Sequence, residues 1–154
     1  MGYADTNLSQ SSVIQAYTMP KVLTGTATIS DAAQTETSAF AILTITPPAG
    51  VVLNDVEIIL DLAKATNGFA AVESTITAQF ALSRKIDGTN WRREAYNEAA
   101  LSGTNAANRA QRLVAGTVGP QGVRVEAVFS ADITADIAVP YVVHFRGSAN
   151  PTIS

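Results

Sequence analysis

The sequence predicts an all-β fold, an antiparallel β-sandwich or small barrel of about 7–8 strands. Two observations predict it. Apolar and polar residues alternate with a period of two in several segments, as in strands that bury one face. Turn-forming pairs rich in glycine, proline and asparagine separate these segments. Leucine-rich heptads and repeats of fixed period are absent, and 154 residues are enough for one domain with a sizeable core.

The expected strands follow the chain in order. Segment 22–29 carries threonine at alternate positions, and segments 40–45 and 56–60 are denser apolar runs rich in isoleucine, which is typical of strands buried on both faces. Strict alternation then marks the three remaining strands, which are 75–83, 123–129 and 139–146. Turns are expected between them at 47–50, 67–68, 87–88 and 119–120.

Residues 1–20 are predicted to form an extended N-terminal arm, and residues 21–154 the single sandwich domain. The arm has few apolar groups, and their spacing is too irregular for a core element. Because ordering each residue costs about 1–2 kcal/mol of backbone entropy, an ordered arm needs contacts outside itself. We expect residues 4–18 to add a strand to a sheet edge of a partner. The candidate partner-binding residues of the arm are Val13, Ile14 and Tyr17.

The composition favours a protein that is partly covered by partners. Apolar residues make up 47% of the chain and charged residues only 15%, against a typical charged share of about 25%. The charge is also uneven, with a balance of −5 over residues 1–83, +4 over 84–124 and −2 over 125–154. Blocks of opposite sign can orient neighbouring subunits, although a single solvated hairpin would produce the same pattern.

The basic stretch SRKIDGTNWRR, residues 83–93, is predicted to be a β-hairpin. Asp87-Gly88 between two strand-like runs favours a type I′ turn, in which both central residues have positive φ. Trp91 is expected to be packed, and the basic side chains to face solvent or a neighbour. The hairpin therefore supplies the other candidate partner-binding residues, Arg84, Lys85, Trp91, Arg92 and Arg93.

Few residues are suited to catalysis, and we expect no enzyme and no cofactor. The single histidine, His144, lies opposite the predicted core face, and no G-x-S-x-G turn accompanies it. Asp55, Glu57 and Asp61 offer carboxylates for a calcium site, but no D-x-D-x-D-G loop is present. Cysteine is absent, which removes thiolate chemistry and disulfides.

Nucleic acids and membranes are not expected as partners. The basic hairpin has one aromatic residue in an acidic chain, whereas single-strand binding needs several interleaved stacking residues. No apolar run approaches the roughly 20 residues that span a bilayer. The N-terminus also lacks the basic and apolar regions of a signal peptide, so no Sec-type export is expected.

In general character the chain resembles the small β-rich decoration or cement proteins of tailed-bacteriophage capsids. The resemblance rests on the polar arm at 1–20, the β-domain rich in alanine and threonine, the lack of cysteine and the DGTNWRR hairpin at 87–93. It implies a non-enzymatic structural protein on the capsid surface of a virion. The implied partners are the major capsid protein or other virion subunits, and the implied oligomer is a homotrimer.

Two other functions fit the same sequence. A carbohydrate-binding β-sandwich would need exposed aromatic residues as a sugar platform, for which Trp91 and Tyr96 are the nearby candidates. Another virion component, such as a tail-tube or head–tail joining protein, would share the polar arm and the β-domain. Co-purification with intact particles would distinguish a virion protein from a carbohydrate-binding module.

Overall fold

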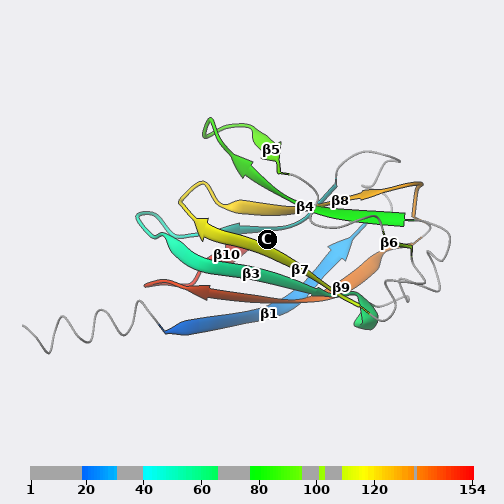
Figure 1. Ribbon diagram of the computed structural model, residues 1–154, viewed down its shortest axis with the longest axis horizontal. Helices are drawn as coiled ribbons and strands as arrows, with labels where there is room; N and C mark the ends of the chain where they lie inside the picture. The colour runs from blue at the N-terminus through cyan, green and yellow to red at the C-terminus, as the bar shows by residue number, and fades with distance from the viewer. Residues whose placement is uncertain (1–18, 31–39, 66–76, 95–100, 103–108, 134) are drawn as a thin grey trace, which may run out of the picture.

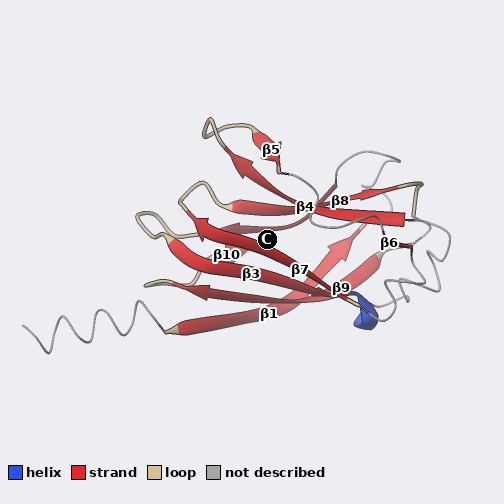
Figure 2. Cartoon of the chain, in the orientation of Figure 1, coloured by secondary structure: helices blue, strands red, loops and turns tan. Residues whose placement is uncertain are grey.

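The fold is a β-sandwich of two antiparallel sheets, seen in a computed structural model (Figures 1 and 2). The structure describes residues 19–30, 40–65, 77–94, 101–102, 109–133 and 135–154. Strands dominate these segments, and a single 3-10 turn, η2 (Leu62–Lys64), is the helix drawn in Figure 2. The described strands are β1 (Pro20–Ile29), β2 (Phe40–Thr46), β3 (Leu53–Asp61), β4 (Thr77–Lys85), β5 (Trp91–Arg93), β6 (Leu101–Ser102), β7 (Ala110–Val118), β8 (Val123–Phe129), β9 (Ile137–Arg146) and β10 (Thr152–Ile153).

Each sheet mixes strands from distant parts of the chain. Sheet A has the order β1-β9-β3-β7, and sheet B has the order β10-β2-β8-β4-β5, with β6 also paired to β4. Every described pair is antiparallel. The predicted sandwich is therefore confirmed, and the two separate sheets decide it against a closed barrel.

The core lies between the sheets and is built from alternate residues of each strand. On β9, the inward positions 139, 143 and 145 are buried, as the alternation predicted, and Tyr141 between them is partly buried. Burying a large apolar side chain stabilises a fold by about 1.5–3 kcal/mol. The largest fully buried side chains come from both sheets, and they are Phe129, Phe145, Ile29, Ile45, Leu53, Ile58, Leu60, Leu62, Leu82, Leu113 and Ile137.

Two strand predictions need correction. The dense runs at 40–45 and 56–60 were expected to be buried on both faces, but β3 alternates from Val56 to Asp61, and β2 departs from alternation only at a register shift, where Ile42 and Leu43 are both buried. Both belong to two-layer packing, in which a sheet buries one face only. Strand β7 was not predicted, although its positions 111, 113 and 115 are buried and alternate with exposed residues.

Turn glycines at two expected positions adopt left-handed backbone. Gly50 has φ +75°, and the amide of Val51 donates to the carbonyl of Pro48 at 3.0 Å, which is the geometry of a type II turn. Gly122 has φ +76°, and its amide donates to the carbonyl of Gly119 at 2.9 Å. These turns join β2 to β3 and β7 to β8. The predicted turn at 67–68 lies outside the described residues.

The first described strand begins at Pro20, at the predicted boundary between arm and sandwich. Residues 1–18 lie outside the described residues, so Val13, Ile14 and Tyr17 have no structural account. The arm and the domain boundary stay predictions.

Candidate functional site at the β4–β5 hairpin

The hairpin predicted at SRKIDGTNWRR is present, but its turn differs from the prediction. Strands β4 and β5 pair antiparallel with Lys85 opposite Trp91, so five residues connect them instead of two. Gly88 has φ +77°, whereas Asp87 is not among the described residues with positive φ. The type I′ prediction is therefore wrong, and the connection is a longer loop.

Asp87 organises this loop through its side chain. Its Oδ1 accepts the backbone amides of Thr89 at 3.0 Å and Asn90 at 2.7 Å, and its Oδ2 accepts the Asn90 side-chain amide at 2.9 Å. Hydrogen bonds from the Asn90 side chain and from both amides hold the pKa of Asp87 well below its usual value. The Asp-Gly pair thus marks the turn by local capping, as Asx turns do.

Trp91 is half-buried and is contacted by two cations. Lys85 Nζ lies over its ring at 5.0 Å from the centroid, and Arg124 Cζ lies over it at 4.7 Å. Cations within about 6 Å of an aromatic face are attracted by the ring quadrupole. The prediction that Trp91 is packed is confirmed, and Lys85 is part of that packing.

Glu126 connects the hairpin to the middle of sheet B. Its side chain is only 5% exposed, although it belongs to the outer face of β8. Arg93 Nε donates to its Oε2 at 3.1 Å, and Arg124 Nε donates to its Oε1 at 2.9 Å. Burial alone would raise the pKa of Glu126, but hydrogen bonds from Arg124 and Arg93 outweigh it and hold the pKa below its ordinary value of 4.5.

Arg84 turns toward the domain instead of toward solvent, which differs from the sequence expectation. Its Nε donates to Glu94 Oε1 at 2.6 Å, and its two terminal nitrogens donate to the carbonyl oxygens of Thr117, at 2.8 Å, and Ala115. Both carbonyls belong to β7, the border strand of sheet A. Arg84 therefore links sheet B to sheet A across the side of the sandwich.

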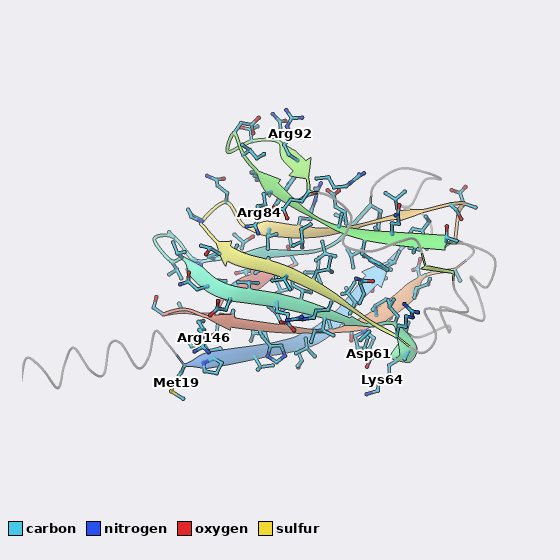
Figure 3. The ribbon with its side chains drawn as sticks, in the orientation of Figure 1. Met19, Asp61, Lys64, Arg84, Arg92 and Arg146 are labelled. Carbon is cyan, nitrogen blue, oxygen red and sulfur yellow. The ribbon has the colours of Figure 1, made fainter. Side chains whose placement is uncertain are left out.

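Arg92 is the basic residue of the hairpin that faces outward most. Its side chain is 62% exposed and lies 4.0 Å from Asp87 Oδ2, a weak surface contact. Arg84 and Arg92 are cross-strand partners, and Figure 3 shows the Arg92 side chain on the side away from the domain and Arg84 close to the strands of the domain. Of the four bases predicted to meet a partner, Arg92 is thus the best placed to do so, and partner binding by the hairpin stays a prediction.

A second candidate surface is the outer face of sheet A. His144 pairs with Val22 of β1 on one side and Glu57 of β3 on the other, on the face opposite the core, as predicted. Val22 is 53% exposed and Val114 on β7 is 57% exposed. In the strand register, His144 and Glu57 lie between these two valines. The rest of the face carries mostly small or uncharged side chains, among them Thr24, Thr26, Thr28, Ile59, Ala138, Pro140 and Val142.

The three carboxylates considered for calcium do not converge on one site. Asp55 has φ +51° at a bulge in β3 and pairs with Arg146, with Oδ2 3.1 Å from Nε. Glu57 pairs with Arg112 at 2.6 Å, and this contact is the main reason that the pKa of Glu57 lies below its usual value. Asp61 faces Lys64 at 3.6 Å. Within the described part of the chain, no group of three or more acidic or histidine side chains is arranged to hold a metal ion.

Sequence reasoning missed Arg124 and Glu126, which complete the cluster around Trp91. The available signal was their position as the two charged residues on the polar side of the strand predicted at 123–129. Tyr96, the second aromatic candidate for a sugar platform, lies outside the described residues. No helix in the described ranges combines the length and apolar character needed to cross a bilayer.

Comparisons with known proteins assign no family. No family model matches the chain, and no curated protein matches it. Among solved structures, a xylan-binding module, CBM15, aligns with a TM-score of 0.38 at 14% identity and covers 83% of this chain and 97% of that chain. The mitogen of Yersinia pseudotuberculosis aligns at 0.37 with 11% identity, covering 83% and 86%. A chain of infectious bursal disease virus, Gt strain, aligns at 0.36 with 10% identity, covering 89% of this chain and 35% of that one.

Proposed function

We propose that the protein is a non-enzymatic structural subunit of a bacteriophage virion that binds and stabilises the outside of the capsid. The main supporting observation is the outer face of sheet A, where Val22 and Val114, on the two border strands, are more than half exposed and most of the other side chains are small or uncharged. Exposed apolar surface of this kind favours a protein partner. The major capsid protein is the partner proposed for it.

This surface also carries charges that can orient the partner. Glu57 of β3 and Arg112 of β7 form an ion pair beside Val114, and Arg146 with Asp55 forms another toward one end. Charged groups at fixed positions on an interface favour one orientation of the partner over others. Trimers at symmetric positions of a shell, as the family resemblance implies, would present three such faces together.

The contacts of Trp91 argue against the carbohydrate-binding alternative. A sugar stacks on an open aromatic face, whereas Lys85 and Arg124 lie over this ring. Removing them would be needed before a pyranose could approach. In addition, the described part of the chain offers no second aromatic side chain beside Trp91 for a platform.

The test is co-sedimentation of the purified protein with capsids that lack it. Val114→Lys replaces an exposed apolar side chain of the face with a charged one without changing the core, and we expect it to weaken capsid binding by about tenfold or more, since burying a charge at an interface costs several kcal/mol. Ile86→Lys is the matched control, because Ile86 is 82% exposed on the hairpin loop, away from sheet A. Equal binding of both variants and the wild type would reject this face, and glycan binding without capsid binding would reject the proposed function.

A further inference from the structure

A cleft runs along the side of the sandwich where the border strands of both sheets meet. Its volume is about 320 Å³, and its walls come from β1 of sheet A and from β2 and β10 of sheet B, with Tyr141 of β9 behind them. None of its side chains is charged. The lining residues are Thr26, Ala27, Thr28, Ile42, Leu43, Tyr141, Ile153 and Ser154.

The cleft is bordered by strand edges and not by one face of a sheet. Successive side chains of a strand point to opposite faces, so three successive residues, 26–28, line one cleft because it follows the edge of β1. The partner edge is β2, which pairs with β10 at two residues and then exchanges hydrogen bonds between Thr44 and Ser154 at 2.7 and 3.0 Å. Beyond Thr44, residues 40–43 have no described strand on that side.

Beyond its first two residues, border strand β1 lacks the features that protect an edge from pairing. Among described residues it pairs only with β9 over all ten of its positions, and Figure 1 shows it as the border of its sheet. Lys21 is its one charged residue, and Pro20 stands at its first position. Natural edges are usually blunted by charges, bulges or proline within the strand. An edge of this length without them is suited to accept another strand.

Gly25 shows that this edge is shaped by packing as well as by pairing. It lies opposite Tyr141, and a Cβ atom there would come within 2.6 Å of the tyrosine ring carbon Cζ. Only glycine therefore lets the ring cross β1 and reach the cleft that it lines. The hydroxyl groups of Tyr141, Thr26, Thr28 and Ser154 provide polar groups beside the apolar wall of the cleft.

We propose that this cleft accepts residues 4–18 of a second copy of the chain as an added strand. The segment is long enough, since ten extended residues span about 33 Å and match β1. Its only charged side chain is Asp5, which suits an uncharged cleft. Backbone hydrogen bonds to the edge would supply affinity, and Val13, Ile14 and Tyr17 would supply register.

A second copy is favoured over the same chain because of the residues that precede β1. To pair with its own β1, the arm would have to reverse tightly at Tyr17-Thr18-Met19-Pro20. That stretch contains none of the glycine, asparagine or aspartate residues that two-residue hairpin turns prefer, and proline has no amide to close the turn. Donation of an arm from one copy to the cleft of the next joins two different surfaces, and such head-to-tail contacts form a ring such as a trimer when the rotation between copies closes.

The test uses disulfide trapping, because the chain has no cysteine of its own. Full-length variants Val13→Cys, Ile14→Cys and Tyr17→Cys are each co-expressed with differently tagged Thr28→Cys and oxidised mildly. A disulfide needs Cα atoms within about 7 Å, so we expect at least one arm position to give about tenfold more mixed dimer than the control partner Val114→Cys, on the opposite border strand. The full-length protein should also be oligomeric by light scattering.

Two outcomes overturn the inference. One is mixed dimer at the control level for all three arm positions. The other is a within-chain disulfide in Ile14→Cys/Thr28→Cys at high dilution, which would place the arm on its own cleft. The inference is separable from capsid binding, because it is measured on the isolated protein. If trapping fails while co-sedimentation with capsids is intact, only the proposal for the cleft is rejected. If trapping succeeds while co-sedimentation fails, only the proposal for the capsid-binding face is rejected.

Discussion

The two sides of the sandwich are closed in different ways. On one side, which we call the closed side, β4 of sheet B lies beside β7 of sheet A, and Arg84 reaches across to the carbonyls of Ala115 and Thr117. On the other, the open side, β1 lies beside β2 and β10 with the uncharged cleft between them. The Arg84 side chain thus occupies two backbone carbonyls of border strand β7, while the edge of border strand β1 stays available for pairing.

This difference teaches which side of the molecule is structural and which is available for assembly. On the closed side, the charged side chains form their contacts within the chain. Arg84 binds Glu94 and β7, and Arg93 and Arg124 bind Glu126. The open side has no charged side chain in its lining, so its side chains do little to repel an incoming strand. The sequence suggests that the basic hairpin is the interaction site, but most of its basic side chains make contacts that stabilise their own domain.

The largest expected effect is on the closed side. Arg84→Ala removes three charged hydrogen bonds and leaves two β7 carbonyls without this donor, so we expect the free energy of unfolding to fall by about 2–4 kcal/mol. Denaturant unfolding measures it. Arg92→Ala is the matched control, because that side chain is mostly exposed and its loss should change stability by about 0.5 kcal/mol or less. Equal losses in the two variants would show that Arg84 does not brace the sandwich.

A smaller effect is expected on the open side. Gly25→Ala would press a methyl group against the Tyr141 ring, and overpacking of this kind costs about 1–3 kcal/mol. Because the ring also lines the cleft, the same change should reduce arm trapping at Thr28→Cys. Gly119→Ala is the control, since nothing lies within 4 Å of a Cβ there. Unchanged stability and trapping in Gly25→Ala would mean that the tyrosine moves aside freely.

The two sides also differ in how much the sequence could predict. The sandwich, most strands and the hairpin follow from period two and turn residues, which are local signals. The role of Arg84 does not, because its acceptors are backbone carbonyls 31 and 33 residues away. The bulge at Asp55, the missed β7 and the cleft likewise depend on which strands become neighbours. An uncharged edge leaves almost no sequence signal until its position at the border of a sheet is known.

The smallest expected effect is a response of the closed side to acid. The pKa of Glu126 lies below its ordinary value of 4.5 in the folded protein, so its contribution to stability is complete above that value and is lost as pH falls through the folded pKa. Protonation weakens its bonds to Arg93, which lies on the hairpin, and to Arg124, which contacts Trp91. Trp91 is the only tryptophan, so its fluorescence should change below about pH 4.5.

Amide exchange at residues 26–28 of the open side, corrected for the intrinsic pH dependence, should not change over that range. The variant Glu126→Gln should lose the fluorescence response because it cannot ionise. A response that persists in this variant, or open-side exchange that rises together with it, would mean that acid loosens the whole sandwich and not the ionic brace.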